Sequence, residues 1–254
     1  MIFILIRISS VLLPFIYFVL FKTMFYLDGF WLWLLVPILL LDIGYFSLLF
    51  LKKKDNKIFI FLIHSLFFLT TGFAYLLILG NNLFINLFLI VWSLIYLLYL
   101  ESILHYFYQT RKVILIDLKN VIAYVNLVTL FFAISFLINL YIFINISWWL
   151  VLLVSFALSF ILLLTRLEVN GVKLFQSLLY SSVVSLIIVE MVAVVLYFTT
   201  SFYASSVMLS LFYYLLSSFS LLNIKKELTK GVIIQYSIFT VVVLALIALT
   251  SQWL

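Results

Sequence analysis

The sequence predicts an all-α protein, a polytopic transmembrane helical bundle of about nine spans (range eight to nine). Of the 254 residues, 69% are hydrophobic and 9% are charged. The mean hydropathy is +1.41. Soluble domains are about half apolar and about a quarter charged, so this composition excludes a soluble enzyme, a disordered tail and a secreted disulfide module. The apolar runs are continuous and do not alternate with polar residues, which favours helices over a membrane β-barrel.

Each expected span is a run of about 20 apolar residues, the length that crosses a bilayer at about 1.5 Å per residue. The expected spans are 2–21, 30–51, 58–79, 83–107, 120–144, 147–165, 174–198, 203–223 and 231–252. Short polar segments such as 52–57 and 166–173 separate them, and tight turns are expected at 80–82 and 145–147. The expected architecture is therefore a single integral membrane domain, 1–254, of successive hairpins with short loops and no soluble domain.

The basic residues predict the orientation in the membrane. Most of the 14 lysines and arginines fall in loops that join an even-numbered span to the next odd-numbered one, and these loops begin at Lys52, Arg111, Arg166 and Lys225. Because such loops stay on the cytoplasmic or matrix side, we expect the N-terminus inside and the C-terminus outside, in a bacterial cytoplasmic or an organellar inner membrane. These loops are also candidate contacts for anionic lipid headgroups.

Tryptophans support the same orientation. Five of the six fall at expected outer ends of spans, where amphipathic rings favour the membrane interface, namely Trp31, Trp33, Trp148, Trp149 and Trp253. The basic loops recur every 55 to 59 residues. This period is compatible with a repeated hairpin, a common origin of transporters. Bilayer thickness alone gives the same period, and the units share no residue-level similarity.

Ionisable residues within spans are the candidate functional residues, because they are costly in a bilayer. They are Arg7, Asp42, His64, Glu101, His105 and Glu190. The first five fall in the inner half of the first four spans. From the helical rise, Asp42 lies about 14 Å and His64 about 10 Å from the inner end of its span. Glu101 and His105 are four residues apart, so they share one face of a helix, with Tyr108 on the same side.

Three interpretations of this inner cluster remain open. A structural hydrogen-bonded network, in which Arg7 neutralises Asp42 or Glu101, is favoured because buried charges need partners. A proton relay would pair a carboxylate with a histidine. A metal site would use Asp42, His64, Glu101 and His105. The sequence has no HExxH pattern, which weakens the metal interpretation, and no metal or other cofactor is expected.

Glu190 is expected about 25 Å from the inner side, far from any basic residue. It is expected to be protonated and hydrogen-bonded, for example to a neighbouring serine, or to face a water-filled cavity. A buried glutamate on a helix is also what a proton- or cation-coupled carrier would use. Candidate serine partners are Ser181, Ser182, Ser185, Ser205, Ser206 and Ser210. Serines at a spacing of four, such as Ser177, Ser181 and Ser185, favour close helix packing. Asn126 and Asn139 are expected to bond between helices, and Pro14 and Pro37 to kink theirs.

The sequence contains no Gly-rich phosphate loop, no GxSxG motif and no cysteine, so it offers no catalytic residues that a known motif would identify. We therefore expect a non-catalytic membrane subunit or transporter-like component of a larger membrane assembly, rather than an enzyme. The alternatives are a proton- or ion-coupled carrier of a small molecule or lipid, using a buried glutamate, and an intramembrane enzyme with a His/carboxylate site. The expected partners are the lipid bilayer and other membrane subunits, and nucleic acid is not expected.

Overall fold

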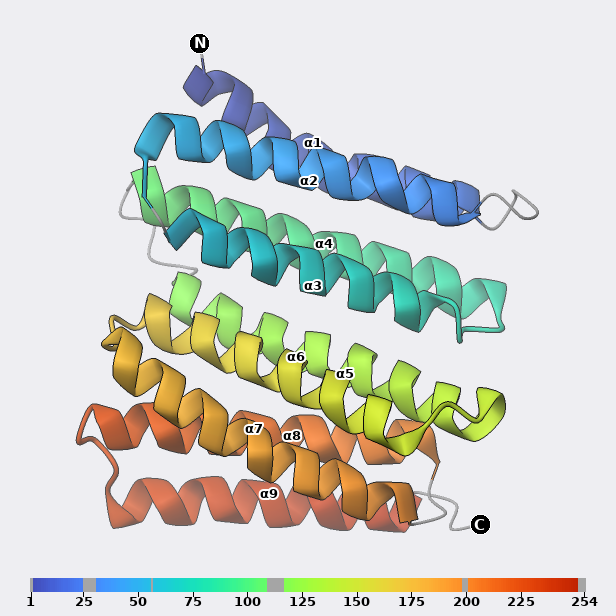
Figure 1. Cartoon of the computed structure of the whole chain (residues 1–254), viewed down its shortest axis with the longest axis vertical. Helices are drawn as coiled ribbons and strands as arrows, with labels where there is room; N and C mark the ends of the chain where they lie inside the picture. The colour runs from blue at the N-terminus through green and yellow to red at the C-terminus, as the bar shows by residue number, and fades with distance from the viewer. Residues whose placement is uncertain (1, 25–30, 56, 109–116, 198–200, 251–254) are drawn as a thin grey trace. The chain divides into compact units, whose positions relative to one another are not determined.

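The computed structural model describes residues 2–24, 31–55, 57–108, 117–197 and 201–250, and over these residues the chain forms nine α-helices and no strand (Figure 1). The helices are α1 Ile2–Met24, α2 Trp31–Lys53, α3 Lys57–Leu76, α4 Asn82–Tyr108, α5 Leu118–Ile144, α6 Trp148–Val169, α7 Leu174–Tyr197, α8 Phe202–Ile224 and α9 Lys230–Thr250. The predicted all-α class is confirmed. The observed helices coincide with the nine expected spans to within a few residues at each end.

Eight of the helices, α1 to α8, are long and apolar enough to cross a membrane. This finding confirms the predicted membrane helical bundle. The ninth crossing, at α9, and the side of the membrane that each loop faces stay predictions. Pro14 lies within α1 and Pro37 within α2, as expected.

Several helices end in a residue with positive φ, which reverses the chain into the next loop. After α6, Gly171 has φ +77°; its N–H donates to the Glu168 carbonyl and the Val172 N–H donates to the Leu167 carbonyl. This pair of bonds is a Schellman cap, and glycine adopts its left-handed conformation without steric strain. Asn145 (φ 55°) ends α5 at the expected tight turn.

The chain divides by its internal contacts into two compact units, unit 1 from Met1 to Val125 and unit 2 from Asn126 to Leu254. The boundary falls within α5. Each unit is described by itself below, and the single membrane domain expected from the sequence stays a prediction.

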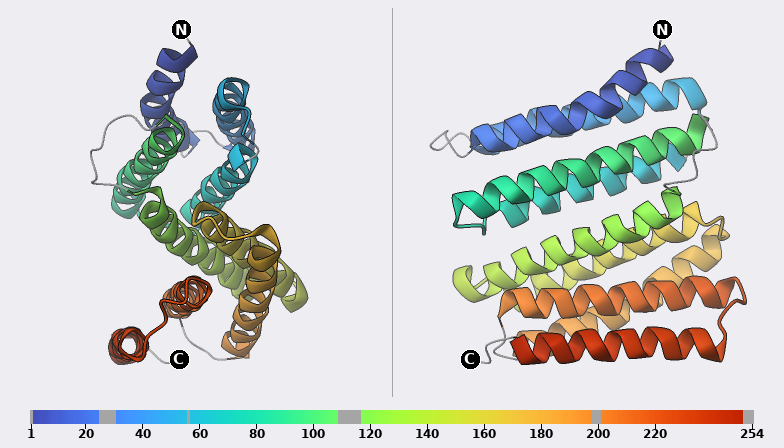
Figure 2. Two further views of the ribbon diagram at one scale, coloured as in Figure 1. Left: turned by 90° about the vertical axis from the view of Figure 1, so that its left-hand side faces the viewer. Right: turned by 180° about the vertical axis from the view of Figure 1, so that it is seen from behind.

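Unit 1 is built around the helices α1 to α4, which are seen obliquely in the left-hand view of Figure 2 and from the side in the right-hand view. α1 packs against α2 and α4, α2 packs against α3, and α3 packs against α4. The centre is aromatic: the ring of Phe68 stacks on Trp92 with centroids 5.5 Å apart, and Phe21 meets Trp92 edge-on at 5.0 Å. A Cβ atom added at Gly72 would overlap the Trp92 indole. The glycine is therefore what lets α3 and α4 approach at this level.

In unit 2, α7 packs against α6 and α8, and α8 also contacts α6 and α9. Ser177, Ser181 and Ser185 on α7 are fully buried, as are Ser155 and Ser159 on α6. Such small side chains let helices approach closely in a membrane. Asn126 on α5 donates from Nδ2 to the Leu162 carbonyl of α6 at 2.6 Å. The expected interhelical role of Asn126 is therefore confirmed.

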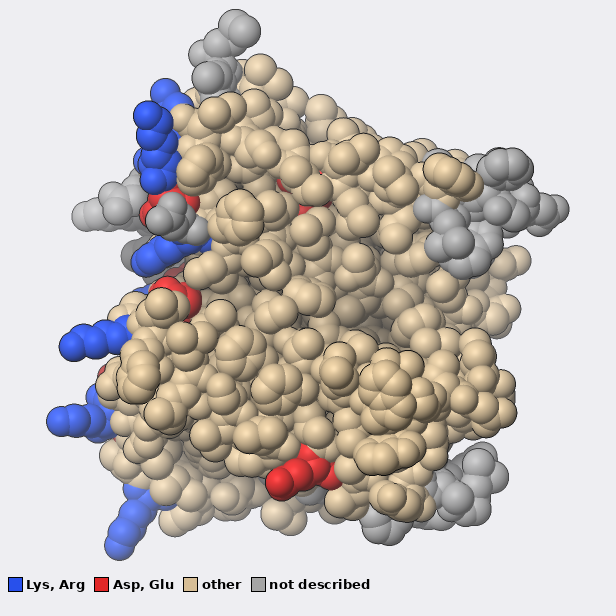
Figure 3. All heavy atoms as spheres, viewed as in Figure 1, with Lys and Arg blue, Asp and Glu red and all other residues tan. Residues whose placement is uncertain are grey.

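Most charged side chains lie at helix ends, and the surface in view between them is nearly free of charge (Figure 3). In unit 1, Lys52 and Lys53 occupy the last turn of α2 and are exposed. In unit 2, the basic residues of the α6–α7 and α8–α9 connections share one end, because consecutive helices are antiparallel. Trp33, Trp148 and Trp149 are exposed, as interfacial anchors would be. Arg111, Lys112 and Trp253 lie outside the described residues.

Candidate functional site

The most polar part of the interior of unit 1 centres on Asp42, whose side chain is fully buried on α2. Tyr96 on α4 donates a short hydrogen bond to Asp42 Oδ1. The Ser65 hydroxyl on α3 lies 3.0 Å from the Tyr96 hydroxyl. Because the single hydroxyl hydrogen of Tyr96 is used toward Asp42, Ser65 must be the donor to Tyr96. Three helices thus contribute to one directional chain, Ser65 to Tyr96 to Asp42.

The second carboxylate oxygen of Asp42, Oδ2, is buried and has no hydrogen-bond partner among the described residues. An ionised carboxylate in a low-dielectric interior needs a counter-charge or several donors. The bonds that the structure describes for Asp42 come from neutral side chains. Oδ2 is therefore an unsatisfied buried acceptor, the kind of group that binds a proton or a small cation in a membrane interior.

A second branch of the network runs through His64, which is also fully buried. Its Nδ1 lies 2.8 Å from the hydroxyl of Tyr99, and Tyr99 in turn donates to the Phe61 carbonyl at 3.2 Å. With the tyrosine hydrogen directed at a carbonyl, which can only accept, Nδ1 carries a hydrogen and donates to Tyr99. The rings of Tyr96 and Tyr99 lie one turn apart on α4 with centroids at 6.2 Å. The branches of Asp42 and His64 are therefore neighbours.

Glu101 lies two residues after Tyr99 on α4 and makes a separate contact. It is half-buried, and the Ser10 hydroxyl on α1 donates to its Oε1 at 2.6 Å. The hydroxyl of Tyr45 is buried without a hydrogen-bond partner among the described residues and lies within electrostatic reach of both Glu101 and Asp42.

Two parts of the predicted inner cluster need correction. Arg7 is exposed, and the described residues contain no ion pair between it and Asp42 or Glu101. Arg7 is exposed on α1, while Ser10, three residues later, is fully buried and donates to Glu101. The carboxyl groups of Asp42 and Glu101 are therefore hydrogen-bonded by neutral hydroxyls, where an ion pair with Arg7 was expected.

The four residues considered for a metal site do not converge. Asp42, His64, Glu101 and His105 are all described, yet the described residues contain no group of three or more His, Asp or Glu side chains that could hold a metal ion. Asp42 and His64 bind different tyrosines, Glu101 binds Ser10, and His105 is half-buried one turn beyond Glu101. The spacing on one helix face was correct, but the side chains are directed to different neighbours.

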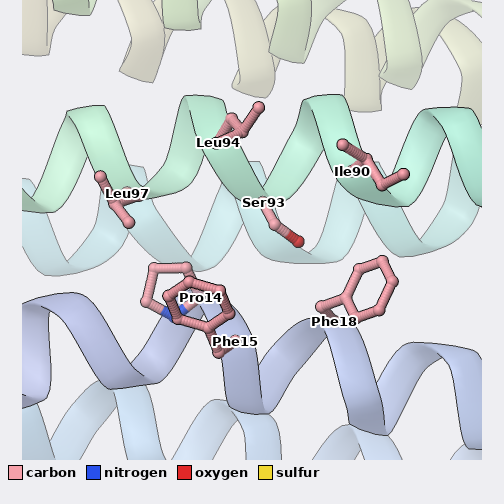
Figure 4. Close-up of a pocket in the computed structure, with 7 residues that line it drawn as sticks. All are labelled: Pro14, Phe15, Phe18, Ile90, Ser93, Leu94 and Leu97. Atoms are coloured by element: carbon pink, nitrogen blue, oxygen red, sulfur yellow. The ribbon is translucent and has the colours of Figure 1, made fainter.

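Two grooves lie on unit 1. The larger, of about 590 Å³, runs between α1 and α2 and contains Tyr45. It is lined by Ser9, Leu13, Pro37, Leu40, Leu41, Gly44, Tyr45, Ser47, Leu48 and Leu51. The smaller, of about 200 Å³, lies between α1 and α4, where Pro14, Phe15 and Phe18 face Ile90, Ser93, Leu94 and Leu97 (Figure 4). Both expected kink positions, Pro14 and Pro37, line a groove.

Glu190 on α7 is exposed, which corrects the expectation of a buried glutamate. Three of the candidate serine partners bond elsewhere: Ser182, Ser206 and Ser210 donate to carbonyls of their own helices. The hydroxyls of Ser181 and Ser185 are buried without partners among the described residues. They lie on the packed face of α7, whereas Glu190 is on the outer face beside Leu186 and Val194.

Arg166 was expected in a loop, and this expectation is wrong. The structure places Arg166 in the last turn of α6, only 7% exposed, with Nη1 donating to Ser217 and Nη2 to Ser218 (3.1 Å) on α8. Its guanidinium lies 5.5 Å from the centre of the Tyr214 ring. The apolar run 161–164 directly before Thr165 could have predicted that α6 continues through Arg166, which is then buried.

These features define an all-α, polytopic integral membrane protein with a buried polar network in its first unit. The sequence matches no protein-family model, and no curated protein and no solved structure is significantly similar to it.

Proposed function

We propose that the chain is a transporter-like integral membrane component of a larger assembly, in which Asp42 binds the coupling proton or a monovalent cation. The observation that carries this proposal is the open Oδ2 atom of the fully buried Asp42. A buried carboxylate without a counter-charge is strongly disfavoured in a membrane interior. Binding a proton or a small cation removes that penalty, and releasing it restores the charge that a coupled transport step requires.

The surroundings of Asp42 support exchange of such an ion. The chain of hydroxyls from Ser65 through Tyr96 ends on the carboxylate. Hydroxyl groups both donate and accept, so they can pass a proton or supply oxygen ligands to a cation. The groove between α1 and α2 contains Tyr45, which lies within electrostatic reach of Asp42. This groove is the proposed route from the surface of the unit to the carboxylate.

The alternative of an intramembrane enzyme has less support. The described residues contain no group of three or more His, Asp or Glu side chains that could hold a metal ion, and His64 is hydrogen-bonded to Tyr99. The carrier alternative based on Glu190 loses its premise of a buried glutamate, since the side chain is exposed. Exposure of a carboxyl on a membrane helix supports the assembly part of the proposal, because a partner helix would remove it from lipid.

The proton form of the proposal is tested by infrared spectroscopy of the purified protein in lipid across a pH titration. A protonated carboxylic acid gives a separate C=O band, and we expect such a band in the unmodified protein and its loss in Asp42→Asn. Tyr96→Phe keeps the carboxyl but removes its donor, so the band should shift in frequency. Glu227→Gln, which changes an exposed carboxyl on a connection between helices, should leave the band unchanged.

The cation form is tested by measuring the melting temperature of the same proteins in Na⁺, K⁺ and choline chloride. Stabilisation by one alkali cation that disappears in Asp42→Asn and persists in Glu227→Gln supports cation binding. If neither the carboxyl band nor a cation effect depends on Asp42, the proposal is wrong and the network is structural. The assembly part is tested separately, by gentle native purification and identification of chains that co-purify.

A further inference from the structure

Arg166 in unit 2 is a buried cation without an acidic partner among the described residues. Its two side-chain hydrogen bonds among these residues go to neutral serine hydroxyls on α8, and its Nε has no acceptor there. The nearest acid in sequence, Glu168, is half-buried and makes no ion pair with it. A guanidinium has five donors in a planar fork, so at least three of them remain available. Neither the charge nor the donors are fully compensated by the protein.

The position of Arg166 specifies the class of anion that would compensate it. The residue lies three positions before the end of α6, about 5 Å from the helix end at the helical rise. That level is close to where the phosphate groups of a bilayer begin. Arginine forms short bidentate bonds with phosphate oxygens, which makes it a common phosphate ligand.

A second cation lies beside Arg166 at the same end of the unit. Lys225, the residue that follows α8, donates from Nζ to Oδ1 of Asn170, and Asn170 Nδ2 donates to the carbonyl of Arg166. Asn170 thus connects the C-terminal ends of α6 and α8, so that Arg166 and Lys225 lie at the same end of these helices. Basic positions between helices at a membrane interface are typical binding positions of anionic headgroups.

From these contacts we propose that Arg166 and Lys225 bind the phosphate of an anionic membrane lipid between the ends of α6 and α8. Ser217 and Ser218 hold the guanidinium plane, which leaves its remaining N–H groups to donate to two phosphate oxygens. The ammonium of Lys225 contacts the same phosphate from the outer side. This inference concerns unit 2 and is independent of the proposed role of Asp42 in unit 1.

The proposal is tested by titrating the full-length protein in nonionic detergent with short-chain phosphatidylglycerol, phosphatidylcholine or inorganic phosphate. The readouts are the melting temperature and the number of lipids retained in native mass spectrometry. We expect phosphatidylglycerol to stabilise the protein and phosphatidylcholine to have a weaker effect. Arg166→Gln should raise the half-saturating concentration of phosphatidylglycerol by about tenfold or more. Lys173→Gln, which removes an exposed basic residue at the same end of the unit, should bind as the unmodified protein does.

Lys225→Gln keeps the buried arginine and provides the test if Arg166→Gln fails to fold; we expect a several-fold loss. Equal stabilisation of the unmodified protein and Lys225→Gln, or equal losses in Lys225→Gln and Lys173→Gln, would overturn the proposal. The second result would mean that the lipid responds to net charge alone. Equal effects of inorganic phosphate and phosphatidylglycerol would identify free phosphate as the ligand, and the lipid assignment would then be wrong.

Discussion

The hydroxyl of Tyr96 on α4 donates to the carboxylate of Asp42 on α2, so one hydrogen bond joins two helices inside unit 1. Both side chains are fully buried. Water does not reach this buried site to replace a lost hydrogen bond, so loss of the Tyr96 hydroxyl leaves a second oxygen of Asp42 unsatisfied. This relationship gives the first prediction.

Tyr96→Phe should lower the free energy of unfolding by about 1–3 kcal/mol, the usual cost of leaving a buried polar group unpaired. The matched control is Tyr124→Phe, because Tyr124 on α5 is 64% exposed; its effect should stay within about 0.5 kcal/mol. Chemical or thermal unfolding in detergent measures both. Equal effects of the two substitutions would show that the Tyr96 hydroxyl contributes nothing specific.

The Ser10–Glu101 contact should appear as a coupling energy between α1 and α4. In a double-mutant cycle of Ser10→Ala and Glu101→Gln, we expect the effects to be non-additive by about 0.5–1.5 kcal/mol, because each single change removes the same hydrogen bond. Arg7→Gln combined with Glu101→Gln serves as the control and should be additive, since Arg7 is exposed. A coupling energy of similar size between Arg7 and Glu101 would contradict the prediction, because it would indicate an ion pair between them.

Gly72→Ala should destabilise unit 1 by about 1–3 kcal/mol, because the added Cβ meets the Trp92 indole in a packed core. Gly44→Ala adds the same methyl group to another membrane helix, where nothing lies within 4 Å of the new atom. That control should be neutral or stabilising by up to about 1 kcal/mol, given the helix propensity of alanine. Unfolding measured with Trp fluorescence distinguishes the two, and a neutral Gly72→Ala would contradict the observed close approach of α3 and α4.

Glu190 and Asp42 should respond oppositely to removal of their carboxyl groups. Glu190→Leu replaces an exposed polar side chain on a membrane-facing helix, so the isolated protein should keep or gain stability. Asp42→Leu breaks the bond to Tyr96 and should lower the unfolding free energy by about 1–3 kcal/mol. The two melting temperatures, measured in the same detergent, test this contrast. A clear loss of stability in Glu190→Leu would indicate that the side chain is buried after all.

The helices were predictable because a bilayer restricts the sequence so strongly. A crossing helix requires about 20 apolar residues, and the runs 83–107 and 174–198 coincide closely with α4 and α7. The tight turn at Asn145 and the interhelical hydrogen bond of Asn126 were also predictable from the sequence. In each case the information lies within one short segment of the chain.

The candidate site was predictable only in part. The sequence singled out Asp42 and His64 by their cost in a membrane, and both are fully buried. It missed the tyrosines that bind them, because Tyr96 and Tyr99 are two of 16 tyrosines and nothing local distinguishes them. It also missed Arg166, since the end of a span is uncertain by about a turn and an arginine there resembles a loop residue.

The sequence by itself determined the class of protein, the order and approximate limits of the helices, and the polar residues that lie at membrane depth. Only the tertiary structure decided which way those polar residues face. In a span that is apolar on every side, the hydrophobic pattern does not fix the rotation of the helix about its axis, and packing against neighbouring helices does. That is why Asp42 is directed to Tyr96, Arg7 and Glu190 face outward, and Arg166 is enclosed against α8.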